Sequence, residues 1–223
     1  MLSAGSEIEV VVMRESPDCD TARAAVALLS PDERQRANRF VLLRDRQRFI
    51  TRRAHLRRLL GERLGVPAES IRLCSGIHGK PALAEPLQKS GVTFNLSHSG
   101  DLTAYAFATR IQIGVDVERI RVVDEADRIA ALMFSPGEYE TYERLPAADK
   151  PLAFLNGWTR KEAFVKATGS GLRHSLDTFD VSLAPGEPAR VLRLGTNHNV
   201  SSWRMHSFFP APGFVAALAA QAA

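Results

Sequence analysis

The sequence predicts an α+β protein in which each half of the chain supplies helices and several short strands. Runs rich in β-branched residues occur near both ends and in the middle of the chain. Two long stretches with helical periodicity lie far apart, at 45–64 and 149–168. Strands and helices do not alternate one by one, so their order differs from the βαβ pattern of a dinucleotide-binding fold.

In the first half, the apolar run at 7–13 predicts a strand. Ser30, followed by proline and two acidic residues, predicts a helix start, because serine caps free amide groups and proline suits the first turn. The clearest helix is expected at 45–64, and Gly65 can end it in the left-handed conformation. The apolar face of this helix comprises Phe49, Leu56, Leu60 and Leu64.

The second half is expected to begin near 110–113, which divides the chain into residues 1–112 and 113–223. Ser135 has the same helix-start pattern as Ser30. A second long helix is expected at 149–168, ending at a Thr-Gly pair. The remaining predicted strands are 71–74, 92–96, 103–109, 111–117, 179–183, 190–194, 200–208 and 213–219.

Composition narrows the class of protein. With 45% hydrophobic and 24% charged residues, the chain can form a core and does not have the composition of a disordered protein. No apolar run approaches the length that spans a bilayer, and the first residues do not resemble a secretory signal. Cys19 and Cys74 lack metal-ligand spacing, which favours reduced thiols in a cytoplasmic protein over a disulfide between them.

Positive charge is concentrated in one stretch. Residues 34–63 contain 11 arginines and only two acidic residues, although the formal net charge of the whole chain is only +4. This asymmetry predicts an anionic partner such as phosphate groups, nucleic acid or an acidic protein. A solvated helix face that only aids solubility is the alternative.

An acid pair lies in the segment GVDVE at 114–118. Asp116 and Glu118 are two residues apart in a β-branched run, so on a strand both carboxylates point to the same side. Two such charges resist joint ionisation unless a cation lies between them. The segment is therefore either a metal site or the exposed polar face of a strand.

Three residues of the second long helix share one face. Trp158, Glu162 and Lys166 recur every four residues. A surface Glu–Lys pair, which contributes about 0.3–0.5 kcal/mol, is the alternative. Trp158 on the same face favours a partly buried pocket instead. Carboxylates without a nearby histidine or cysteine favour Mg²⁺ over zinc.

The segment FNLSHSGD at 94–101 leaves a predicted strand and enters a polar turn. Ser97, His98 and Ser99 supply hydrogen-bonding groups at a strand end, where ligands often bind. An ordinary loop histidine is the alternative for His98. The run cannot form a Ser-His-Asp triad, and Lys80 lacks the upstream glycine spacing of a phosphate-binding P-loop.

Taken in order, four segments resemble the 4′-phosphopantetheinyl transferases, over about residues 30–180. They are GKP at 79–81, FNLSHSGD at 94–101, GVDVE at 114–118 and WTRKEAFVKATGSGL at 158–172. The length and the presence of both halves resemble the full-length Sfp-type class rather than the half-size trimeric class. The resemblance implies transfer of the phosphopantetheine arm of coenzyme A to a serine of an acyl or peptidyl carrier protein, with release of 3′,5′-ADP.

The resemblance also implies residue roles. Asp116, Glu118 and Glu162 would hold Mg²⁺, with Mn²⁺ as an alternative metal. Glu162 would accept the proton of the carrier serine, and Lys166 would contact the pyrophosphate and the leaving phosphate, so that Glu162, Lys166 and Asp116 form the catalytic set. The residues implied to bind coenzyme A are Arg48, Arg53, Ser97 and His98 at the 3′-phosphate, Lys80 at the adenine and phosphate portion, and Lys166.

By the same resemblance, two α+β halves related by a pseudo-twofold axis would pack side by side in a monomer, with coenzyme A in the cleft between them. A carrier from a fatty-acid, polyketide or nonribosomal-peptide synthase would dock at the mouth of the cleft, with 119–137 as part of that surface. Met133 and Phe134 are candidate apolar contacts there, although core packing is the favoured interpretation.

Two other functions are alternatives. A metal-dependent nuclease would use the acid pair, with the arginine stretch on DNA. Such nucleases need Glu and Lys two apart on a strand, whereas Glu162 and Lys166 are four apart on a helix. A non-enzymatic nucleic-acid binder would leave Trp158 and the carboxylates unexplained, and the chain lacks interleaved aromatic residues for base stacking.

Overall fold

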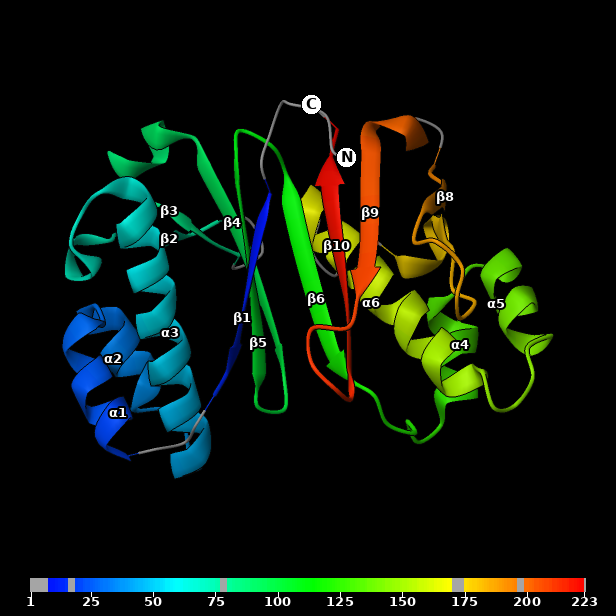
Figure 1. Ribbon diagram of the computed structural model, residues 1–223, viewed down its shortest axis with the longest axis horizontal. Coiled ribbons are helices and arrows are strands. Elements are labelled where there is room, and N and C mark those ends of the chain that lie inside the picture. The colour runs from blue at the N-terminus through cyan, green and yellow to red at the C-terminus, as the bar shows by residue number, and fades with distance from the viewer. Residues whose placement is uncertain (1–7, 16–18, 77–79, 170–174, 196–198, 223) are drawn as a thin grey trace.

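The computed structural model describes residues 8–15, 19–76, 80–169, 175–195 and 199–222. It is built in layers, with helices on both outer sides and two antiparallel three-stranded sheets between them (Figure 1). The predicted mixed α+β class is confirmed. No helix in the described part of the chain is long and apolar enough to cross a membrane.

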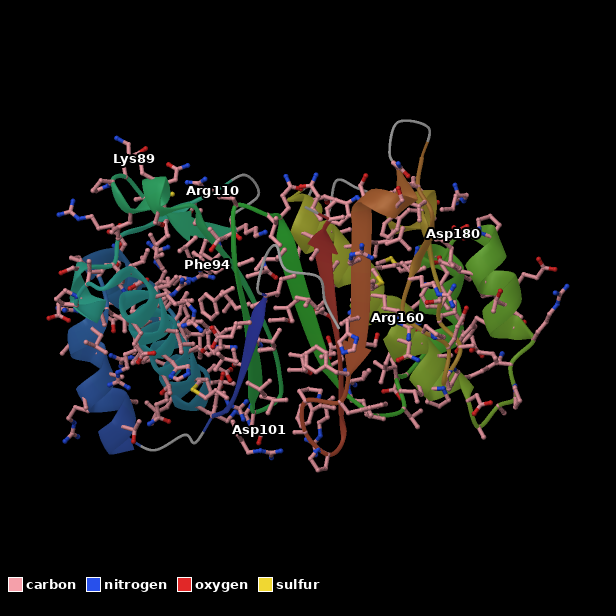
Figure 2. All side chains as sticks on the ribbon, turned by 45° about the horizontal axis from the view of Figure 1, so that its top comes forward. Lys89, Phe94, Asp101, Arg110, Arg160 and Asp180 are labelled. Atoms are coloured by element: carbon pink, nitrogen blue, oxygen red, sulfur yellow. The ribbon has the colours of Figure 1, made fainter. Side chains whose placement is uncertain are left out.

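The first sheet lies in the N-terminal part of the chain. Its strands, in spatial order, are β1 (Glu9–Arg14), β5 (Leu102–Thr109) and β4 (Val92–Ser99). The helices on this side are α1 (Cys19–Ala25), α2 (Pro31–Ala37) and α3 (Leu43–Leu64). Phe94 fills the space between α3 and the sheet (Figure 2), together with Leu60 and Phe107.

The second sheet follows in the chain and is covered by the second long helix. Its strands, in spatial order, are β6 (Ile113–Arg119), β10 (Phe214–Gln221) and β9 (Trp203–Phe208). The helices on this side are α4 (Ala126–Met133), α5 (Pro136–Glu143) and α6 (Lys150–Thr168). Two small sheets pair β2 (Leu73–Ser75) with β3 (Pro81–Leu83) and β7 (Asp180–Val181) with β8 (Val191–Arg193).

The core between the two large sheets consists mainly of small and β-branched residues. Ala104 and Ala106 of β5 face Val115 and Val117 of β6 across this core. Successive residues of a strand point to opposite sides. The polar residues of β6 that alternate with these valines therefore face α6.

Both halves repeat one plan. In each large sheet the first strand pairs with the last, and a long helix lies between them in the chain. In each half, a serine and a glutamate form a capping box at the start of a short helix. The same glutamate pairs with a cation of the long helix: Glu33 with Arg57 and Glu138 with Lys161, each at 2.7 Å.

Most predicted elements are confirmed. The capping boxes at Ser30 and Ser135 form, and both long helices end at a left-handed glycine, Gly65 and Gly169. The prediction was wrong where the pattern is short. Helices α1 and α4 and strand β3 were not predicted, and the expected strand at 200–208 begins with a 3-10 turn, Val200–Ser202. The polar turn expected at 97–99 was also wrong, because these residues belong to strand β4.

Candidate active site

The two large sheets meet at their edge strands, β4 and β6, where side chains of β4 bond to β6. The Val115 N–H donates to Asn95 Oδ1 at 2.9 Å. Two residues further along β4, Ser97 Oγ donates to Asp116 Oδ1 at 2.7 Å. Ser99 Oγ then donates to Glu118 Oε2 at 2.7 Å. Since alternate residues of β4 point the same way, one face of this strand forms a polar seam between the two large sheets.

Lys166 of α6 reaches this seam. Its ammonium donates to Asp116 Oδ1 at 2.6 Å and to Ser97 Oγ at 3.1 Å. Three residues that the sequence singled out, from β4, β6 and α6, therefore form one hydrogen-bonded group. Asp116 is only 4% exposed. Burial raises the pKa of its carboxyl, and the Lys166 ammonium offsets part of this effect.

Glu118 and Glu162 belong to the same electrostatic group. Burial raises the pKa of Glu162, and the negative charges of Asp116 and Glu118 raise it further. Burial also raises the pKa of Glu118, against the lowering effect of its hydrogen bond with Ser99, and Asp116 raises it further. Carboxylates whose charges raise one another's pKa favour a nearby cation or proton.

The donor set fits a hard cation such as Mg²⁺. The three carboxylates supply only oxygen ligands, and Asp116 Oδ2 is buried without a hydrogen-bond partner among the described residues. The carboxylates do not converge, however: within the described ranges, no three carboxylate, imidazole or thiol groups lie close enough together to hold a metal. Lys166 is the cation that Asp116 contacts in this structure.

Gly114 permits the close contact between β6 and α6 that assembles the group. A β-carbon at this position would lie 2.1 Å from Ala163 O and 2.4 Å from Ala167 N. Any larger residue would therefore push α6 away from β6. The first residue of the GVDVE segment thus places Glu162 and Lys166 next to the acid pair.

Sequence reasoning missed Lys161, a buried residue of α6 that fixes this helix to the chain segments around it. Its side chain is 0% exposed, and its ammonium donates to Leu176 O and Phe179 O, both at 2.6 Å. Its third partner is Glu138. A signal was present, because at helical spacing Lys161 shares its face with Phe154, Gly157, Phe164 and Val165. A lysine in such an apolar stripe requires a buried anion.

Lys80 lies at the end of α6. Its ammonium donates to the carbonyls of Lys166 at 2.6 Å and Ile113 at 3.2 Å. Burial, followed by the charge of Lys166, lowers the pKa of Lys80 to about 8. Lys80 therefore joins the N-terminal part of the chain to both β6 and α6. Gly79, from the same motif, lies outside the described residues.

A basic cavity of about 540 Å³ opens beside the seam. Both arginines that the sequence singled out, Arg48 and Arg53, line it together with His98, and so does Arg52, which sequence reasoning missed. Arg53 is also paired with Glu33 at 3.4 Å. His98 is exposed to the cavity. Partial desolvation there, followed by the charges of Arg52 and Lys166, lowers its pKa to about 4.

Phe134 and Met133 show which of their two interpretations holds. Phe134 is only 3% exposed and packs in a core cluster with Tyr142 and Phe154. Met133 is partly buried against a neighbouring core cluster. The core interpretation of Phe134 is therefore confirmed, because its ring fills the space that Gly157 leaves open on α6.

Family profiles match both halves of the chain. The profile of the 4′-phosphopantetheinyl transferase superfamily matches residues 112–219. The profile of the 4′-phosphopantetheinyl transferase N-terminal region matches residues 15–110. The two matches together take in the polar seam, the acid pair and the basic cavity.

Individual proteins agree with the profiles. The 4′-phosphopantetheinyl transferase HetI of Nostoc sp. is 38% identical over 193 residues, which is 86% of this chain and 78% of HetI. The transferase psf-1 of Bacillus pumilus is 32% identical, over 87% of this chain and 82% of its own length. Sfp of Bacillus subtilis is 28% identical, over 71% and 68%. The chain therefore belongs to the 4′-phosphopantetheinyl transferase superfamily and is a phosphopantetheinyl transferase of the Sfp-like type.

Proposed function

We propose that this protein transfers the 4′-phosphopantetheine arm of coenzyme A to a serine hydroxyl of an apo carrier protein and releases 3′,5′-ADP. The observation that carries the proposal is the hydrogen-bonded group of Lys166, Asp116 and Ser97 beside an arginine-lined cavity. A cationic donor and carboxylates next to a basic hollow suit a reaction at a pyrophosphate, because negative charge must be neutralised while a P–O bond breaks.

The chemistry assigns a step to each residue. The serine oxygen forms a bond to the phosphorus that carries the pantetheine arm, and the bond from that phosphorus to the bridging oxygen breaks. Glu162 accepts the serine proton, directly or through one water, and its raised pKa makes it a stronger base. Lys166 donates to the phosphate oxygen of the departing 3′,5′-ADP, where a point charge is suitable.

Asp116, Glu118 and Glu162 are the proposed ligands of Mg²⁺, with Mn²⁺ as the second candidate. All three are oxygen ligands, which Mg²⁺ prefers. The unpartnered Asp116 Oδ2 is available to such an ion. When bound, Mg²⁺ would neutralise charge on the pyrophosphate.

Coenzyme A is proposed to lie along the basic cavity. Arg48, Arg53, Ser97 and His98 would bind its 3′-phosphate end, since charged donors form strong hydrogen bonds with phosphate. Lys80 uses two of its three N–H donors on carbonyl groups. Its third donor would be directed to the adenine and phosphate portion of the ligand.

The repeated plan of the fold supports a proposal about the whole chain. We treat residues 1–112 and 113–223 as two halves related by a pseudo-twofold axis, with coenzyme A bound between them. The shared strand order and the paired capping-box glutamates support this relation. Because one chain supplies both halves of the site, the enzyme would act as a monomer.

The carrier is proposed to be an acyl or peptidyl carrier of a fatty-acid, polyketide or nonribosomal-peptide synthase. The segment 119–137 is the proposed docking surface. Its exposed apolar side chains are Val122 and Leu132, which are 77% and 71% exposed. The free thiol of Cys74 fits a reducing compartment, so we place the reaction in the cytoplasm.

Intact-mass spectrometry of an apo carrier tests the proposal. The carrier is incubated with this protein, coenzyme A and Mg²⁺, and a gain of roughly 340 Da that disappears with EDTA is expected. Glu162→Gln should prevent the gain while the protein stays folded. No gain with any acyl or peptidyl carrier, together with no binding of coenzyme A, would overturn the proposal.

A further inference from the structure

One buried carboxylate beneath the basic cavity has no part in the chemistry described so far. Glu15 follows β1, and its side chain is 1% exposed. Its backbone N–H donates to Asp101 O at 2.6 Å, and Thr103 Oγ1 donates to its Oε1. Strand β1 and its neighbour β5 therefore fix this carboxylate in place from below the cavity.

Two cavity arginines face this carboxylate with the inner nitrogen of the guanidinium group. Arg52 Nε lies 3.4 Å from Glu15 Oε1, and Arg48 Nε lies 3.9 Å from Oε2. The terminal nitrogens of both arginines have no hydrogen-bond partner within the described ranges of the chain. The Nε edge of each guanidinium group therefore faces Glu15, and its terminal nitrogens are left to bind a ligand.

Both contacts are longer than an ordinary N–H···O hydrogen bond. Glu15 Oε2 and Arg48 Nε are buried, and neither has a hydrogen-bond partner among the described residues. A buried, unsatisfied charge is costly. Apolar residues in place of the whole charged group would often give equal or greater stability, so filling this space does not by itself require charges here. The arrangement therefore points to a role in the cavity above.

We infer that Glu15 is a positioning residue that holds Arg48 and Arg52 by their Nε edges, so that their terminal nitrogens form a fixed clamp for the 3′-phosphate of coenzyme A. The inference rests on the proposed function, because it assumes that coenzyme A occupies the cavity. Two guanidinium groups with fixed planes match a phosphate monoester better than two mobile cations do. Glu15 would therefore determine the preference for ligands that carry the 3′-phosphate.

A change of charge alone would act in the opposite direction. Removal of an anion below the cavity makes the cavity more positive, which by itself strengthens the binding of an anionic ligand. Loss of the anchor instead lets the arginines rotate and weakens binding of the phosphate. The sign of the effect therefore separates positioning from simple charge balance.

The test uses Glu15→Gln in the full chain, which keeps the shape of the side chain and an oxygen for Thr103. Calorimetry gives the dissociation constants of coenzyme A and 3′-dephospho-coenzyme A for both proteins. We expect Glu15→Gln to raise the dissociation constant of coenzyme A on the order of tenfold. The dissociation constant of 3′-dephospho-coenzyme A should stay nearly unchanged. Glu9→Gln is the matched control, since Glu9 lies on β1, pairs with Arg63 of α3 and does not line the cavity.

Each outcome distinguishes one claim. An unchanged ratio of the two constants, or tighter coenzyme A binding, would overturn the role of Glu15. Wild-type protein that binds neither ligand would overturn the proposed function, and this inference with it. If Glu15→Gln does not fold, Arg52→Lys provides the test, because lysine keeps the charge and lacks the planar fork. If Arg52→Lys binds coenzyme A and 3′-dephospho-coenzyme A with the wild-type ratio of dissociation constants, the proposed clamp is also contradicted.

Discussion

Gly114→Ala tests whether close contact between β6 and α6 assembles the active site. The new β-carbon would lie 2.1 Å from Ala163 O and 2.4 Å from Ala167 N. Both are backbone atoms, so no side chain can rotate out of the way. An ordinary contact begins near 3.4 Å. The strand and the helix must therefore separate by roughly 1 Å.

This separation should affect stability and rate differently. Overpacking costs about 1–3 kcal/mol, which lowers the Tm of a chain of this size by roughly 2–12 °C. Displacement of reacting groups by about 1 Å lowers the rate on the order of 100-fold, because Lys166 and Glu162 move away from Asp116. Coenzyme A affinity should fall much less than the rate, since Arg48, Arg52 and Arg53, which line the cavity, belong to α3.

The assay compares transfer rate, coenzyme A affinity and Tm for wild type, Gly114→Ala and Gly195→Ala. Gly195 is the matched control, because a β-carbon there meets no atom within 4 Å and the residue lies outside the proposed docking segment 119–137. Alanine at this position should leave stability unchanged or raise it by up to about 1 kcal/mol. A Gly114→Ala protein with the wild-type rate would refute the reasoning, and so would an equal loss in the control.

Three further predictions concern residues around the site. Lys161→Met should lower the free energy of unfolding by about 3–5 kcal/mol, because Glu138 is left buried without its cation. Adding Glu138→Gln to the same chain should restore part of the lost stability, because the buried negative charge is then removed. A loss below 1 kcal/mol in denaturant titration would contradict a buried pair. Lys80→Met should lower both kcat and coenzyme A affinity, kcat because its ammonium holds the Lys166 and Ile113 carbonyls, and affinity because its third donor is proposed to meet the ligand; an unchanged kcat would contradict the first role. Arg52→Gln should raise the pKa of His98 from about 4 toward its ordinary value, because a neighbouring positive charge is removed and the imidazole then gains its proton at higher pH. An NMR titration of His98 with the same midpoint in both proteins would contradict this.

Much of the fold could be predicted from local sequence. The serine-proline starts at Ser30 and Ser135 and the glycine stops at Gly65 and Gly169 act within a few residues, so the pattern alone locates the helix ends. Helices α1 and α4 have only 7 and 8 residues, too few for a clear helical period.

The candidate site was only partly predictable, because its geometry depends on contacts between distant residues. Lys80 meets the carbonyl of a residue 86 positions away, and Glu15 meets Thr103 across 88 positions. No local pattern encodes such pairs. The arginine stretch also divides in the fold, since Arg57 is buried against Glu33 while Arg48 and Arg52 line the cavity. A count of charges cannot separate these roles.

The group formed by Lys166, Asp116 and Ser97, at the seam between the two large sheets, is the proposed catalytic centre. The most direct test is the initial rate of carrier modification by Lys166→Met at saturating coenzyme A, relative to Lys89→Met. Lys89 is a surface lysine, 78% exposed, in the 3-10 turn Leu87–Ser90, and its ion-pair partner is Glu85. We expect a loss of at least about 100-fold for Lys166→Met and a wild-type rate for Lys89→Met. A Lys166→Met rate equal to that of Lys89→Met would contradict it.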